Sequence, residues 1–143
     1  MLLLWCGFWM IAFPISIRDM NTQTIPNVYL KFLAALTAVY LFIDGFGNMA
    51  NLLAGFIALC LLVAFRVGMG DVKLIALTML IVNSQMDFSV MRYFPILLIC
   101  ALAHLLIQGL VNWQLPERIA LAPSIFLAFA LYLSARLPLD LQQ

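Results

Sequence analysis

Six apolar windows, separated by short polar stretches, divide the chain; they cover Leu2–Ile17, Val28–Ile43, Met49–Phe65, Val72–Val82, Tyr93–Val111 and Ile119–Leu133. A helix that crosses a bilayer needs about 20 apolar residues, with about 17 as a practical minimum, and all windows but the fourth reach or approach that length. The fourth runs into the polar sequence NSQMD, so it must use polar flanks, tilt, or lie where the membrane is thinned. The pattern predicts an all-α fold, a polytopic membrane helix bundle with about six transmembrane helices.

Six such spans nearly exhaust the 143 residues, which leaves room for short loops only. We therefore expect a single membrane-embedded domain over residues 1–143. The first window has no Lys or Arg ahead of it, because the first cation of the chain is Arg18. A signal peptide begins with a basic segment, so this window is interpreted as a retained transmembrane helix.

Composition also indicates a membrane protein. Hydrophobic residues make up 66% of the chain and charged residues 9%, with a mean hydropathy of +1.13, whereas a soluble domain is about half apolar and about a quarter charged. The net charge of +1 and the lack of a basic run argue against a nucleic-acid partner. Cys6, Cys60 and Cys100 stand alone in apolar windows without CxxC spacing, so we expect buried small side chains and no metal site.

The distribution of Lys and Arg predicts that both termini lie outside the cytoplasm. Cytoplasmic loops of membrane proteins are enriched in these two residues. With the N-terminus outside, two cations fall on the outer side, Arg92 and Arg136, and five on the cytoplasmic side, namely Arg18, Lys31, Arg66, Lys73 and Arg118. This topology brings Asp19 and Asp71 to the same, cytoplasmic face.

Asp19 and Asp71 are the candidate catalytic residues, because charges near membrane depth are costly and mark functional sites. Two carboxyl groups at one site share a proton, so that the pKa of one rises while the other stays low. Such a pair supplies a general base that activates a water molecule and a general acid that protonates the amide carbonyl under attack. A structural alternative stays open: Asp71 caps the fourth helix after a turn at Gly68 and Gly70, and Asp19 pairs with Arg18.

Other polar positions also have two interpretations. Lys73 either holds one carboxylate ionised or extends its ammonium to the membrane surface. His104 begins a polar stripe that recurs every four residues in the fifth window, with Gln108 and Asn112. Such a stripe joins helices, so His104 is expected to be structural rather than catalytic. Gly55, in NLLAGFIAL, is expected at a close helix contact.

Three motifs carry a resemblance to a known family. GMGDVKL at residues 68–74 fits the pattern GxGD-x-K-L, and DMNTQTIPN at residues 19–27 places Ile-Pro-Asn six positions after an Asp. The Ala-Pro pair at residues 122–123, in RIALAPSIFLAFAL, is the third. Their order and spacing resemble the type IV prepilin peptidases, which are membrane aspartyl proteases. A lone GxGD is a weak signal, but two Asp motifs joined by a pair of spans are specific.

The resemblance implies that Asp19 and Asp71 form a catalytic dyad at the cytoplasmic edge of the bacterial inner membrane. The implied substrates are prepilins or pseudopilins, cleaved after the glycine that ends a short basic leader, by attack of an activated water without a cofactor or metal. Pilus or secretion assembly components are implied further partners. The residues that the motifs mark as active-site support are Ile25, Pro26, Asn27, Gly68, Gly70, Lys73 and Pro123. The two glycines are expected to admit substrate backbone or to adopt positive φ, and Pro26 is expected in the first turn of its helix.

The chain also departs from the family pattern. Bifunctional members carry an N-terminal cytoplasmic region with paired CxxC motifs and methylate the cleaved pilin, and this sequence has neither feature. It resembles the short, peptidase-only branch of Flp/Tad-type pilus systems, so no methyltransferase domain is expected. Two alternatives stay open: a small carrier or channel subunit in which the carboxylates bind cations or relay protons, and a non-catalytic subunit of a pilus assembly.

Overall fold

The computed structural model describes residues 2–85, 88–112 and 120–140. Within these ranges the chain forms six α-helices and no strand: α1 (Leu2–Thr22), α2 (Asn27–Asp44), α3 (Met49–Ala64), α4 (Met69–Gln85), α5 (Val90–Asn112) and α6 (Ala122–Asp140). The predicted all-α fold with six helices is confirmed. Two helices, α2 and α5, are long and apolar enough to cross a membrane, and α3 and the first part of α6 are apolar but shorter.

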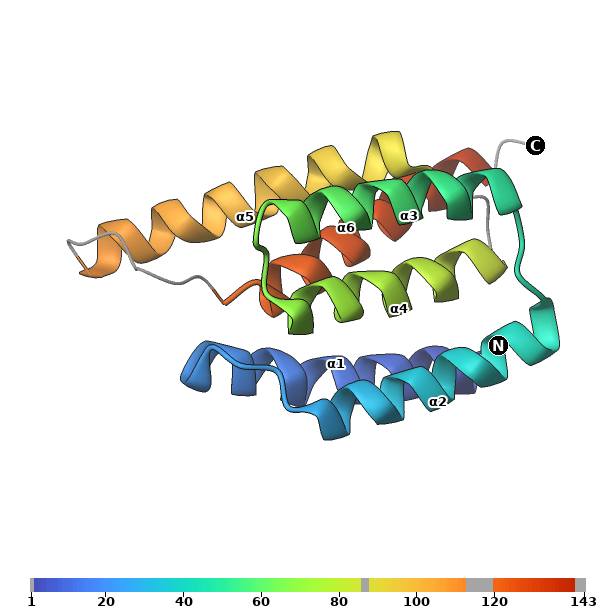
Figure 1. Ribbon diagram of the computed structural model, residues 1–143, viewed down its shortest axis with the longest axis horizontal. Helices are drawn as coiled ribbons and strands as arrows, with labels where there is room; N and C mark the ends of the chain where they lie inside the picture. Colours follow the sequence, from blue (N-terminus) through green and yellow to red (C-terminus); the bar gives the residue numbers. More distant parts are fainter. Residues whose placement is uncertain (1, 86–87, 113–119, 141–143) are drawn as a thin grey trace.

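The helices lie along the long axis of the bundle and alternate in direction (Figure 1). The ribbon shows α1 and α2 side by side at the lower edge, α3 and α5 at the upper edge, and α4 between them. Because of the alternation, one end of the bundle gathers the last turns of α1, α3 and α5 with the first turns of α2, α4 and α6. We call this end proximal and the opposite end distal.

Helix α4 is the centre of the bundle and contacts α2, α3 and α6. Its sequence is apolar around most of its circumference, as a buried helix requires, and its buried apolar side chains are Val72, Leu74, Ile75, Met79, Ile81 and Val82. The helix is longer than the fourth apolar window, since it includes Met69 and Gln85. Helix α1 likewise continues past its window to Thr22. The polar flanks of both windows are therefore helical, and they carry the two candidate carboxylates.

Aromatic side chains fill the bundle towards its distal end. The ring of Phe8 in α1 lies 5.8 Å from Phe126 and 5.0 Å from Phe129 in α6, measured between centroids. A second group joins the start of α5 to the end of α6, where Tyr93 and Tyr132 are 6.0 Å apart. Such ring pairs add stabilisation beyond the area that they bury. They fix α1, α5 and α6 against one another at a distance from the proximal end.

Glycine and cysteine positions test two expectations. Gly55 is buried in α3, and a Cβ there would overlap the thioether of Met79 in α4, so the expected close helix contact is confirmed. Cys100 is buried as expected, but Cys6 and Cys60 are exposed on the surface of the bundle. The expectation of burial is therefore wrong for these two cysteines, because their helices present them outward rather than to the core.

The distal loop between α2 and α3 is fastened to the end of α4 by Asn83. The side-chain amide of Asn83 donates to the carbonyl oxygens of Phe46, at 2.7 Å, and Asn48, at 3.1 Å. Gly47 lies between these acceptors with φ +65°, and a Cβ on it would overlap the backbone carbonyl of Asn83. Gly45, in the same loop, has φ +77° but no atom within 4 Å of such a Cβ. Both glycines therefore have a positive φ, and they differ in their surroundings.

We expect Gly47→Ala to lower the free energy of unfolding more than Gly45→Ala does. Both variants place a Cβ on backbone with a positive φ, which costs about 1–3 kcal/mol. Only Gly47→Ala also forces α4 away from the loop, an overpacking effect of about 1–3 kcal/mol. Equilibrium unfolding of the two purified variants measures the difference, and equal destabilisation would contradict the contact with Asn83.

Candidate active site

Asp19 lies in the last turn of α1, with only 3% of its surface exposed. Its Oδ2 atom accepts a hydrogen bond of 2.9 Å from the backbone N–H of Ala122, the first residue of α6. The first N–H groups of a helix have no partner within the helix, and the helix dipole favours a negative charge there. Pro123 follows and has no N–H to offer. The start of α6 therefore holds the buried carboxylate of Asp19 in place.

Asp71 is the third residue of α4 and is half-buried. The helix starts one residue after Gly68, whose carbonyl accepts the N–H of Val72 at 3.0 Å. A Cβ on Gly68 would lie 2.9 Å from Asp71 Oδ2, so the carboxylate packs against the bare backbone of Gly68. The alternative in which Asp71 caps α4 is wrong, because Asp71 lies within the first turn and not before it.

Gly70 has a different role from the one that its motif suggested. A Cβ on Gly70 would lie 3.4 Å from the Cβ of Ile25, so Ile25, from the loop between α1 and α2, occupies the space beside this glycine. The glycines with positive φ in the described ranges are Gly45 and Gly47, which belong to the distal loop. The expectation of positive φ at Gly68 and Gly70 is therefore wrong, and the face of Gly70 is closed by the chain itself.

A cavity of about 410 Å³ at the proximal end brings the two carboxylates to one space. It is lined by Asp19, Gln23, Thr24, Ile25, Asn27, Gly68, Met69, Gly70, Asp71 and Lys73. Pro26 and Pro123 do not line it. Pro26 precedes α2 with extended backbone and so lies just before the first turn rather than in it.

The motifs did not mark three residues of the cavity lining, which are Gln23, Thr24 and Met69. Gln23 adopts φ +51° and donates its N–H to the carbonyl of Asp19 at 2.7 Å. This left-handed residue ends α1 and turns the chain towards Ile25. The polar segment after Asp19 was the sequence feature that could have indicated Gln23 and Thr24. It was not used because these residues match no motif.

Burial raises the pKa of both carboxyl groups, which lie beyond the predicted apolar windows. Burial raises the pKa of Asp71 to about 7, and the nearby Asp19 adds to the increase. Burial also raises the pKa of Asp19, but the Ala122 N–H and His104 act in the opposite direction. The hydrogen bond to Asp19 stabilises its charged form. The donor at Asp19 therefore opposes protonation of that group, whereas burial and the neighbouring charge both favour protonation of Asp71.

Lys73 extends from α4 beside the same cavity, yet it is exposed. Within the described ranges it forms no ion pair with either carboxylate. Burial and Asp19, rather than a neighbouring cation, set the direction of the Asp71 pKa. These observations favour the interpretation in which Lys73 extends towards the surface over the one in which it holds a carboxylate ionised.

His104 joins α5 to α6 close to the start of α6. Its Nε2 lies 2.9 Å from the amide nitrogen of Gln108, and its Nδ1 lies 3.0 Å from Ser124 Oγ. Each ring nitrogen of His104 therefore has a hydrogen-bond partner, Gln108 on α5 and Ser124 on α6. His104 thus links helices as expected of a polar stripe. The side chain of Asn112, the last member of that stripe, lies outside the described residues.

Comparison with known proteins identifies the family. The model of the type IV leader peptidase family matches residues 3–110, which is most of the chain. No curated protein and no solved structure matches the chain. The chain belongs to the type IV leader peptidase family, and the predicted family is confirmed. The matched region includes Asp19 and Asp71, whereas Ala122, which binds Asp19, lies beyond it.

We expect the pKa of Asp71 to fall in the Asp19→Asn variant. The substitution removes a negative charge that raises this pKa, so the ionised form of Asp71 becomes less unfavourable. Asp44→Asn is the matched control, because Asp44 ends α2 at the distal end. Infrared titration of the carboxyl band with labelled aspartate measures the pKa. An unchanged Asp71 pKa in Asp19→Asn would contradict the coupling of the two groups.

Proposed function

We propose that the protein is a membrane aspartic endopeptidase that removes the leader of prepilins or pseudopilins after its terminal glycine, at the cytoplasmic face. Membership of the leader peptidase family supports a protease that acts on prepilin-type substrates in general. The observation that carries the finer assignment is the single cavity that Asp19 and Asp71 line together. These residues come from opposite ends of α1 and α4, and only the fold brings them to one space.

In the proposed mechanism the two carboxyl groups have different roles. Asp19, whose charged form accepts the Ala122 N–H, takes a proton from a water molecule that attacks the scissile carbonyl carbon. Asp71, whose pKa is raised by burial and by the charge of Asp19, gives a proton to the carbonyl oxygen. The C–N bond of the resulting tetrahedral diol then breaks as the amine nitrogen gains a proton from Asp19 and Asp71 recovers one from the diol.

The surface of the bundle supports a location in the membrane. Large apolar side chains cover it, including Phe42 at 93% exposure, Met91 at 87% and Phe65 at 79%. Extended apolar surface of this kind marks a contact with lipid or with partners. Placing Lys31 and Lys73 on the cytoplasmic side agrees with the distribution of cations. Arg118 and the side chain of Arg136, which entered the same argument, lie outside the described residues.

The position of the carboxylates separates this proposal from a carrier or a proton relay. A relay through the bilayer places acidic residues along the path, whereas Asp19 and Asp71 both lie at the proximal end of the bundle. A non-catalytic assembly subunit would have no need of two carboxyl groups that share one cavity.

Asp19→Asn and Asp71→Asn should each abolish leader release, because each removes one partner of the proton exchange. Mass spectrometry of a synthetic prepilin mixed with the purified protein follows the reaction, and we expect at least a 10²-fold loss of rate, the size typical of a general acid or base. Asp44→Asn should retain full rate. Full activity in either dyad variant, with normal insertion into the membrane, would rule out the dyad.

The rate of leader release should decline as the pH rises above about 7. Asp71 has a pKa of about 7, so it loses the proton that the carbonyl oxygen needs as the solution becomes more alkaline. On the acid side the rate should decline again when the second carboxyl group gains a proton. A pH profile of kcat/KM, which reports the pKa values of the free enzyme, measures both limbs. A rate that stays constant from pH 6 to 9 would contradict the role of Asp71 as the acid.

A further inference from the structure

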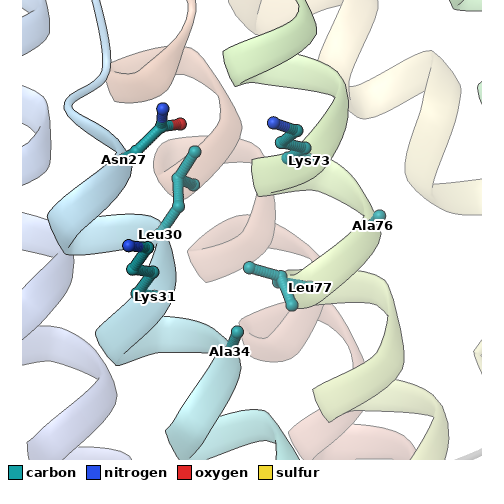
Figure 2. Close-up of a pocket in the computed structure, with 7 residues that line it drawn as sticks. All are labelled: Asn27, Leu30, Lys31, Ala34, Lys73, Ala76 and Leu77. Atoms are coloured by element: carbon teal, nitrogen blue, oxygen red, sulfur yellow. The ribbon is translucent and has the colours of Figure 1, made fainter.

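A groove between α2 and α4 opens beside the candidate active site. Its volume is about 510 Å³, and it is lined by Asn27, Leu30, Lys31, Ala34, Lys73, Ala76 and Leu77 (Figure 2). Asn27 and Lys73 also line the cavity of the two carboxylates, so the two spaces adjoin. In Figure 2 these two polar side chains lie at one end of the groove, and Ala34 and Leu77 lie further along the helices.

Two lysines give the lining of the groove a positive charge. Lys31 comes from α2 and Lys73 from α4, and both side chains are exposed. The lining contains no acidic residue. Neither lysine makes an ion pair or a side-chain hydrogen bond in the part of the chain that the structure describes. These two ammonium groups and the Asn27 amide are the hydrogen-bond donors that the lining offers to an anionic headgroup.

The rest of the groove is apolar. Helices α2 and α4 are in direct contact, and a helix with its side chains is about 10–12 Å across. A further helix therefore cannot enter between them, whereas a single hydrocarbon chain can lie along Leu30, Ala34 and Leu77. The volume is within the range of about 300–1,000 Å³ that small-ligand sites occupy. The fitting ligand has an anionic head and an apolar chain.

We propose that this groove binds one anionic glycerophospholipid, with its headgroup at the lysines and Asn27 and one acyl chain along the apolar wall. The proposal rests on the membrane location that the proposed function assumes. The amide of Asn27 donates to a phosphate oxygen. Because Lys73 lines both spaces, the headgroup lies at the rim of the catalytic cavity and covers its α2 side. The lipid is then part of the wall against which a substrate is held.

Native mass spectrometry of the whole protein, released from detergent, tests this binding with two lipids that have the same acyl chains. We expect phosphatidylglycerol to bind more tightly than phosphatidylcholine. A lysine near an anionic headgroup contributes roughly a fivefold change in affinity, so Lys31→Gln with Lys73→Gln should reduce the preference by about 30-fold. Arg66→Gln is the matched control, since Arg66 is an exposed cation at the same end but outside the groove. Equal affinity for the two lipids would overturn the proposal.

Two further arms separate the lipid from other occupants. Glycerol phosphate should compete weakly, because it lacks the acyl chain, and competition as strong as that of the whole lipid would indicate a simple anion site instead. A photoreactive side chain at Ala34, in vesicles that contain phosphatidylglycerol and a synthetic prepilin, should crosslink to lipid. Crosslinking to the peptide alone would assign the groove to the substrate. Binding is measured without cleavage, so Asp19→Asn protein gives the same answer, and failure of the peptidase assay leaves this result intact.

Discussion

The hydrogen bond from the Ala122 N–H to the Asp19 carboxylate is the contact on which the proximal end depends. A carboxylate that is 3% exposed is costly to bury unless it is paired. The start of α6 supplies that pairing, with a donor at 2.9 Å and the positive end of a helix dipole. Removing it would leave a buried charge and an unsatisfied N–H together. The bond therefore fixes the end of α1 against the start of α6, although 103 positions separate the two residues.

The same contact makes the two carboxyl groups unequal. Asp19 is buried but accepts a hydrogen bond. Asp71 is half-buried against Gly68, and the charge of Asp19 raises its pKa further. Identical side chains in equivalent surroundings would compete for one proton without a preferred site. Here the two groups differ because a backbone N–H donates to Asp19 and so favours its ionised form. The proposed assignment of base to Asp19 and acid to Asp71 follows from that asymmetry.

The apolar pattern predicted the centres of the six helices but not their ends. Hydropathy ends a window at the first polar residues, so it stopped α1 before Asp19 and started α4 after Asp71. In the structure these residues lie in helical turns, since a helix can continue past its apolar core when tertiary contacts satisfy its polar flank. The contact between Asp19 and Ala122 could not be predicted, because it depends on how α1 and α6 pack and leaves no local pattern.

The contact between the two Asp motifs is made by residues that have no role in the proposed reaction. Ile25, in the segment after Asp19, packs against Gly70, directly before Asp71. A larger residue at position 70 would separate the loop from α4 and with it the two carboxylates. Aromatic packing fixes the distal end of the bundle, so such a change would open the proximal end alone. The spacing of each motif thus sets how closely the segment with Asp19 approaches the segment with Asp71. This spacing is required for packing as well as for the proposed catalysis.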